Sequence, residues 1–165
     1  KKFQIGDQAV YPGHGVAEVV GIETKEIAGQ TINVYILQVT SSKLKIMVPA
    51  QNAETVGLRD IVSDDEVGEI FDILRTKEEA KDTQTWNRRH REYMDKIKTG
   101  SLFEIAEVLR DLSLLGLNKD LSFGERRLLE TAKGLVVAEV AVARHAALST
   151  VQAEIETIFA AAAAA

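Results

Sequence analysis

The chain has 165 residues, of which 45% are hydrophobic and 27% are charged, and its formal net charge is −5. This composition is ordinary for a folded protein and argues against a protein that coats nucleic acid through charge alone. The absence of cysteine excludes disulfides and thiolate metal sites, and no apolar run reaches the roughly 18 residues of a membrane span. The excess negative charge lies in residues 61–82.

The first part of the chain is predicted to form short β-strands. Ile32, Val34 and Ile36 alternate with Asn33 and Tyr35, and a period of two is typical of a half-buried strand. Glycine-rich or polar turns separate the apolar runs. Four or five strands of this kind predict a small, strongly bent sheet or half-barrel. The runs that we expect to be strands cover residues 9–11, 16–22, 32–39 and 44–48.

Beyond Gly57 the apolar residues follow the period of amphipathic helices. Four serines have Glu or Gln three residues later, which is the capping-box pattern of a helix N-terminus; they are Ser63, Ser101, Ser122 and Ser149. A further helix without this pattern is expected to begin near Trp86 and to end at Gly100 in the left-handed conformation. The sequence therefore predicts an α+β chain: residues 1–60 form a β-domain, residues 61–159 form five helices, and 160–165 is a polyalanine tail without a functional role.

Each predicted helix has one apolar face that should point into a common core. We expect the helix beginning near residue 101 to end at Gly116, and the helix beginning near 122 to extend as far as Ala147. The core-facing residues are predicted to be Val67, Ile70, Phe71 and Leu74; Trp86, His90, Tyr93 and Ile97; Ile105, Val108, Leu109 and Leu112; Leu128, Leu129, Ala132, Leu135 and Val136; and Val151, Ile155, Ile158 and Phe159.

No pattern in the sequence indicates an enzyme. His14, His90 and His145 lie in three different predicted elements, and none has a second ligand at metal-binding spacing. The chain has neither a phosphate-binding glycine loop with its lysine nor a nucleophile elbow. Acidic residues at 64–66 are explained by the helix dipole, which favours negative charge in a first turn. We therefore predict no catalytic residue, no metal site and no cofactor.

The helix predicted at residues 86–98 carries five basic and two acidic residues. Arg88, Arg91 and Lys98 form a stripe that is separate from the apolar residues. This stripe is either a solvated face above a core-facing Trp86, or a phosphate-binding face with an aromatic residue at its edge. The tryptophan follows a polar stretch at the start of the helix, which favours the second interpretation. Arg126, at the start of the next-but-one helix, is a second place where a phosphate could bind.

Six stretches of the sequence carry a resemblance to a known family: Gly6–Gly15, Val48–Pro49, Val56–Arg59, Trp86–Arg91, Ile105–Leu112 and Leu121–Arg127. Over residues 3–159 the chain resembles the CarD/CdnL family of bacterial RNA polymerase-binding transcription regulators. The resemblance implies a Tudor-like β-domain that binds the β subunit of RNA polymerase, and a compact helical domain that contacts promoter DNA. It also implies a monomeric protein of the bacterial cytoplasm, associated with the nucleoid through the polymerase.

The same resemblance implies particular site residues. The polymerase contact corresponds to Lys25, Met47, Val48 and Pro49. The tryptophan wedge of the family corresponds to Trp86, and its DNA-contacting bases correspond to Arg88, Arg91 and Arg126. The expected activity is stabilisation of the open promoter complex at the upstream edge of the bubble. Two alternatives stay open: a stand-alone nucleic-acid chaperone, and a protein-interaction adaptor that does not bind DNA.

Overall fold

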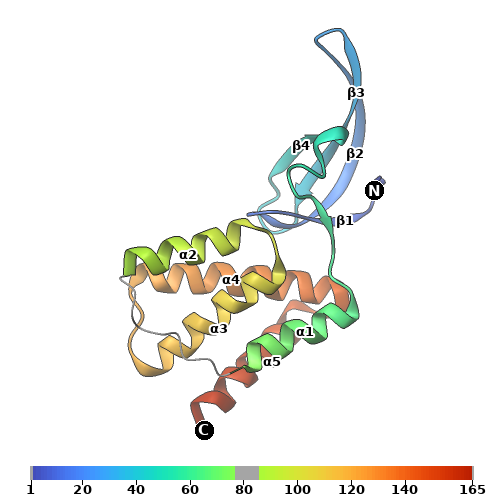
Figure 1. Cartoon of the computed structure of the whole chain (residues 1–165). Coiled ribbons are helices and arrows are strands. Elements are labelled where there is room, and N and C mark those ends of the chain that lie inside the picture. The colour runs from blue at the N-terminus through green and yellow to red at the C-terminus, as the bar shows by residue number, and fades with distance from the viewer. Residues whose placement is uncertain (1, 77–85, 165) are drawn as a thin grey trace. The chain divides into compact units, whose positions relative to one another are not determined.

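The structure, a computed structural model, describes residues 2–76 and 86–164, and all side chains in these ranges except those of residues 86 and 87. The chain divides into two compact units, Lys1–Ile61 and Val62–Ala165. The first is a five-stranded antiparallel sheet and the second is a group of five helices (Figure 1). The predicted fold class, a small β-domain followed by five helices, is confirmed.

The β-unit has its strands in the order β4-β3-β2-β1-β5, so that β4 and β5 are the two edges of the sheet. Inner-facing residues of β3 such as Tyr35 and Leu37 pack in the core with Val19 and Val48. The Tyr35 hydroxyl accepts a hydrogen bond from the Phe3 N–H at 3.2 Å. The strands are β1 (Gln8–Tyr11), β2 (Gly15–Ile27), β3 (Gln30–Val39), β4 (Lys45–Pro49) and β5 (Arg59–Asp60), with a short 3-10 helix at Ala50–Asn52.

Strand β2 is longer than the sequence pattern predicts. We expected it to end at Ile22, where the apolar run stops, but it pairs with β3 as far as Ile27. The extra residues are held by the backbone ladder and not by burial, so apolar periodicity gives no signal for them. Ala28 and Gly29 close the hairpin with φ values of 54° and 79°, as a two-residue primed turn requires. The hairpin therefore projects beyond β4 (Figure 1).

The helical unit is built around α3 (Leu102–Asn118), which contacts each of the other four helices. Almost every core residue predicted from the helical period is buried or packs against the core, and Trp86 lies outside the described side chains. His90 is half-buried, and Arg89 is buried beside it on the face that we expected to be apolar. The other helices are α1 (Asp64–Arg75), α2 (Trp86–Lys98), α4 (Phe123–Arg144) and α5 (Leu148–Ala164).

The predicted helix starts are confirmed in part. Ser63 and Ser122 form complete capping boxes. Ser101 occupies the N-cap position of α3 but makes no side-chain capping bond. The prediction at Ser149 is wrong, because α5 already begins at Leu148 and Ser149 lies within it.

Two of the predicted helix ends are also wrong, and one is confirmed. Helix α3 continues past Gly116 to Asn118, since a single glycine costs only about 1 kcal/mol in a helix. Helix α4 ends at Arg144, because His145 adopts the left-handed conformation with φ 53°. Gly100 is left-handed after α2, as predicted, with φ 76°. Among the helices that the structure describes, none is long and apolar enough to cross a bilayer.

Candidate functional site

One face of the β-sheet carries exposed apolar side chains beside a lysine. Directly paired residues of neighbouring strands project to the same side of a sheet. The register pairs Lys25 with Ile32, Val34 with Pro49, and Ile36 with Met47, so these three pairs share the face opposite the core. We call this surface the outer sheet face and define it as Glu23, Lys25, Ile32, Ile36, Met47 and Pro49; Val34, which lies among them, is only 3% exposed.

The structure brings together Lys25 and Met47, two of the residues predicted to bind polymerase. The Lys25 Nζ lies 4.0 Å from the Met47 sulfur and 3.8 Å from a carboxylate oxygen of Glu23. Met47 is 49% exposed on the edge strand β4. The pair therefore offers a partner an apolar contact and a cation at adjacent positions.

Val48 is placed differently from the other predicted polymerase contacts. Its side chain is 2% exposed and packs in the core, on the side of the sheet opposite Met47. It can face a partner only through its backbone. Because β4 is an edge strand, its outward backbone N–H and C=O groups can pair with a strand of another chain.

Sequence reasoning missed Ile27, which also belongs near this surface. It ends β2 at the tip of the hairpin and is 53% exposed. It alternates in β2 with Lys25, so the two side chains leave the same side of the strand. The sequence signal for Ile27 was the turn at Ala28-Gly29, because both strands of a hairpin extend to the residues that flank a two-residue turn.

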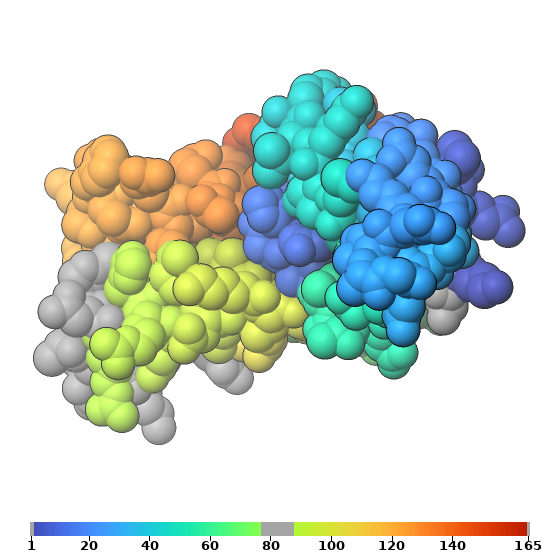
Figure 2. Space-filling model, turned by 90° about the horizontal axis from the view of Figure 1, so that it is seen from above, coloured from blue at the N-terminus to red at the C-terminus, as the bar shows by residue number. Residues whose placement is uncertain are grey.

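The exposed face of α2 carries the second set of predicted residues. Arg88, Arg91 and Lys98 are exposed, and within the described part of the chain none of the three has a hydrogen-bond or ion-pair partner. Asp95 lies between Arg91 and Lys98 on this stripe, so the positive charge is concentrated in the N-terminal half of the helix. Figure 2 shows α2 in yellow-green as a continuous surface beside the orange start of α4.

Polar contacts hold α2 against α3. Lys96 donates to Glu107 at 2.7 Å, and Arg89 is only 8% exposed. Burial, followed by the nearby charge of Asp111, raises the pKa of Tyr93 to about 12, which is consistent with its inward position. With Arg89 and Tyr93 turned inward, the helical period leaves Arg88 and Arg91 pointing outward.

The predicted wedge, Trp86, is the first residue of α2, and its side chain lies outside the described residues. A second aromatic residue was missed by sequence reasoning. Phe123 opens α4, is 70% exposed, and lies with its ring centroid 5.8 Å from the guanidinium carbon of Arg127. The signal available was its position directly after the cap residue Ser122, where the first residue of a helix need not face the core.

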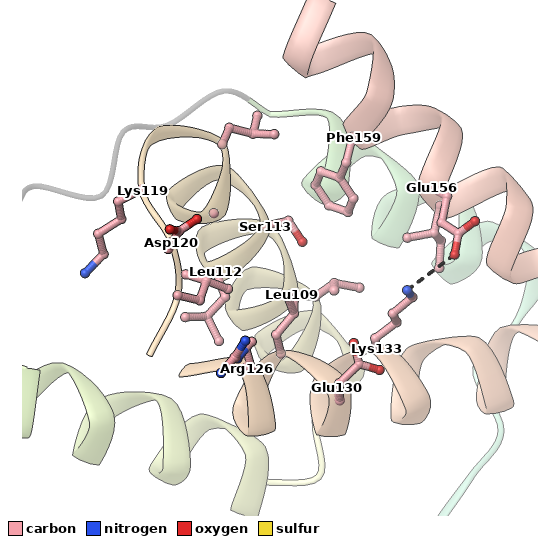
Figure 3. A pocket seen from close by; sticks show the side chains of 15 residues that line it. Leu109, Leu112, Ser113, Lys119, Asp120, Arg126, Glu130, Lys133, Glu156 and Phe159 are labelled. Atoms are coloured by element: carbon pink, nitrogen blue, oxygen red, sulfur yellow. Dashed lines mark hydrogen bonds and ion pairs between the residues drawn. The ribbon is translucent and has the colours of Figure 1, made fainter. Parts of the chain in front are cut away.

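Arg126 lines a hollow of the helical unit. The hollow has a volume of about 970 Å³, and its walls come from α3, the α3–α4 connection, α4 and α5 (Figure 3). None of the described residues that line this hollow comes from α2. The structure thus brings Arg88 and Arg91 together on one helix face, and it places Arg126 on the rim of this hollow.

The histidines and acids do not form a metal centre in the part of the chain that the structure describes, where no three potential ligands come together. His14 contacts the ring of Tyr11 in the β1–β2 turn, with centroids 5.4 Å apart. His145 ends α4. The features that remain as candidate sites are therefore the exposed surfaces of the two units.

A sheet with an exposed apolar edge, joined to a helical unit with a cationic face, describes a two-part binding protein. Comparison with known proteins gives its family. Residues 3–62 match the family model described as CarD-like/TRCF RID domain, and residues 69–156 match that of the CarD C-terminal domain.

The chain is also similar to a relative of known sequence and to a solved structure. The chain is 31% identical over 140 residues to the "Putative transcription factor YdeB" of Bacillus subtilis (strain 168), which covers 85% of this chain and 91% of that protein. A solved structure described as "CdnLNt from Myxoccoccus xanthus" is 47% identical, covering 39% of this chain and 90% of the other, with a TM-score of 0.33. The chain belongs to the CarD/CdnL family, and this membership supports a role related to transcription.

Proposed function

We propose that this protein regulates transcription by holding RNA polymerase with its β-unit and promoter DNA with its helical unit. The polymerase contact uses the outer sheet face and the edge strand β4, on the β subunit that the family resemblance implies. The DNA contact uses the cationic face of α2. The protein works as a monomer in the bacterial cytoplasm, and its effect is to stabilise the open promoter complex.

The observation that carries the proposal is the pairing of Lys25 with Met47 on an exposed apolar surface next to an unpaired strand edge. A partner strand can add to β4 through backbone hydrogen bonds, while side chains beside the edge provide specificity. Met47 and Pro49 supply apolar area, and Lys25 supplies a charge that selects an acidic partner.

The helical unit supports only weak DNA binding by itself. Arg88 and Arg91 are the two unpaired arginines on the α2 face, and each phosphate neutralised contributes one increment of salt-dependent affinity. The chain has a net charge of −5, which opposes this binding at long range. Docking on polymerase solves the problem, because tethering gives the second contact an effective concentration that reaches the millimolar range.

Trp86 is the proposed wedge at the upstream edge of the bubble. Stacking of one aromatic side chain on a nucleotide is worth roughly 1–3 kcal/mol, and a tenfold longer lifetime of the open complex requires only about 1.4 kcal/mol. One residue is therefore enough if it contacts the open state better than the closed state. Phe123 and Arg127 are a second exposed aromatic–cation pair in the same unit. Arg126, at the start of α4, stays a prediction of the resemblance.

The proposal is tested with two variants of the whole chain that change surface charge. Met47→Glu should abolish most binding to polymerase, since it places an acid beside Lys25, neutralises that cation and removes the apolar contact. Arg88→Glu should leave polymerase binding unchanged and shorten the lifetime of the open promoter complex. Both positions are exposed, so circular dichroism should show that both variants fold.

Three outcomes would reject parts of the proposal. Undiminished polymerase binding by Met47→Glu would remove the outer sheet face from it. If Arg88→Glu and Trp86→Ala both leave the open-complex lifetime unchanged, the protein is an adaptor that does not act on DNA. Tight DNA binding without polymerase would instead support a stand-alone nucleic-acid chaperone.

A further inference from the structure

The chain contains two methionines, Met47 and Met94, and no cysteine. Their thioethers therefore hold its only sulfur atoms. Met94 in α2 is half-buried and packs against the core of the helical unit, whereas Met47 is 49% exposed on the edge strand β4. A reagent dissolved in water therefore meets the side chain of Met47 more readily than that of Met94.

The Met47 sulfur lies beside a cation. The Lys25 Nζ donates toward this sulfur at 4.0 Å, which is a weak contact because a thioether is a poor hydrogen-bond acceptor. The same Nζ is 3.8 Å from a carboxylate oxygen of Glu23. An oxygen atom bound to the sulfur would stand next to the ammonium group and accept a charge-assisted hydrogen bond from it. The lysine that gives the outer sheet face its positive charge is thus already in place to bind an oxidised Met47.

The neighbours of Met47 on the outer sheet face are apolar. Ile36 is its cross-strand partner, and Pro49 follows two residues later in β4, so that it leaves the same side of the strand. Oxidation of a methionine makes a flexible apolar side chain polar, and this disrupts interfaces that depend on it. Chemistry at one sulfur atom therefore changes both features that this face offers a partner, its apolar area and its free cation.

We propose that Met47 is an oxidation site at which hydrogen peroxide switches off the polymerase contact; this inference rests on the function proposed above for the outer sheet face. The sulfur attacks one oxygen of the peroxide, so that an S–O bond forms while the O–O bond breaks. The sulfur loses two electrons, and the departing hydroxide takes the proton of the transferred hydroxyl and leaves as water. Reductases return the sulfoxide to the thioether, with two thiols oxidised to a disulfide and the oxygen released as water.

Binding of polymerase and oxidation of Met47 exclude each other. Polymerase that covers the outer sheet face keeps peroxide from the sulfur, so only protein that is free of polymerase is oxidised. The oxidised protein then docks poorly, because its sulfoxide oxygen must lose water in an apolar contact and because Lys25 is occupied by that oxygen. The modification therefore holds free protein away from polymerase until a reductase restores it.

The first measurement is the rate of sulfoxide formation in the full chain treated with hydrogen peroxide, followed by mass spectrometry of its peptides. Met47 should be oxidised about threefold faster than Met94 or more, because oxidation follows exposure. An excess of RNA polymerase should slow the reaction of Met47 and leave that of Met94 unchanged. Equal rates at the two residues in the free chain would overturn the proposal.

The second measurement is the affinity of the treated chain for polymerase, which is added only after catalase has removed the peroxide. The oxidised wild-type chain should bind about tenfold more weakly or worse, and methionine sulfoxide reductase should restore its binding. Met47→Leu, whatever its own affinity, should bind equally well with and without treatment. The matched control Met94→Leu keeps Met47 and should lose affinity on treatment as the wild type does.

Two further results would overturn the proposal: wild-type chain with Met47 fully converted that binds as tightly as untreated chain, or Met47→Leu that loses as much affinity on treatment as the wild type. Undiminished binding by untreated Met47→Glu would reject the polymerase contact itself, and this inference with it. If Met47→Glu loses binding but the sulfoxide does not, the contact stands and the oxidation switch alone is rejected.

Discussion

The two units of this protein differ in what they bury. The described residues of the β-unit bury no charged side chain, whereas the helical unit buries four: Arg89, Arg110, Glu125 and Glu139. A sheet satisfies its backbone within its own ladder and can close on an apolar core. Helices leave free amides and carbonyls at their ends, and here charged side chains satisfy some of them. The comparison leads us to expect that the stability of the helical unit depends more strongly on ionisation than that of the β-unit.

Two buried carboxylates show how this works. Glu139, in the middle of α4, accepts a hydrogen bond at 2.9 Å from the N–H of Val62, the first residue of the helical unit. Glu125 accepts the N–H of Ser122 at 2.8 Å and completes the capping box of α4. The Glu139 side chain holds the backbone at the start of the helical unit, and the Glu125 side chain holds it at the start of α4.

The largest effect should come from the apolar core of the β-unit. Leu37 is fully buried, and Leu37→Ala should cost about 2–5 kcal/mol of folding free energy through lost contacts and a cavity. Met47→Ala, on the opposite face, should cost less than about 0.5 kcal/mol. Urea denaturation measures both, and the only tryptophan, Trp86 in α2, reports on the helical unit. If Leu37→Ala shifts the tryptophan signal as far as the circular dichroism signal, the two units do not unfold separately.

The next largest effect should come from Glu139. Replacement by alanine leaves the buried N–H of Val62 without its acceptor, at a cost of about 1–3 kcal/mol. The matched control is Glu130→Ala on the same helix, where an exposed acid without a described partner is removed. Thermal unfolding should separate the two variants clearly. Equal stability of both would mean that water replaces the lost acceptor and that this hydrogen bond is not needed.

Glu125 should give the helical unit its sensitivity to acid. Burial opposes ionisation of this carboxyl, but hydrogen bonds from Ser122 and the charge of Lys119 outweigh it and hold its pKa below the ordinary 4.5. A lowered folded pKa contributes stability that is present above pH 4.5 and lost as the pH falls through the folded value. Glu125→Gln should therefore flatten the loss of stability between neutral pH and acid, as measured by urea denaturation at several pH values.

Asp111 is the control of opposite sign for this pH experiment. Burial raises its pKa above 3.8 despite the neighbouring Arg110, so its contribution to stability falls as the pH rises through the folded value. Asp111→Asn should make the acid-induced loss steeper, whereas Glu125→Gln should make it shallower. Identical pH profiles for the two variants would contradict the assignment of acid sensitivity to Glu125.

The smallest effect concerns the cationic face of α2. Asp95 interrupts the stripe of Arg88, Arg91 and Lys98, so Asp95→Asn should raise DNA affinity by about two- to threefold at low salt, in keeping with the small energies of exposed charges. The gain should disappear at high salt, where screening acts within a few ångströms. Titrations of promoter DNA at two salt concentrations measure it. A gain that is independent of salt would show that the substitution acts on the fold and not on charge.

The order of the elements, their types and most of the core could be predicted from the sequence. Apolar residues alternate around Ile32–Ile36, and Val67, Ile70 and Leu74 have helical spacing. Both patterns depend only on which side of a strand or helix faces the core, so the local sequence is enough to predict them. The capping boxes at Ser63 and Ser122 were predictable for the same reason, because they use only four consecutive residues. The resemblance to the CarD/CdnL family added Lys25 and Met47 as candidates.

Other features were decided by contacts between segments that are distant in the chain. The length of β2 depends on its ladder with β3, the inward position of Arg89 depends on the packing of α2 on α3, and Val62 meets Glu139 across 77 residues. Only the tertiary structure places Arg126 on the rim of the hollow between α3, α4 and α5. Local sequence determines which face of an element is apolar, but which other element covers that face, and which charges are left without a partner, follows from packing alone.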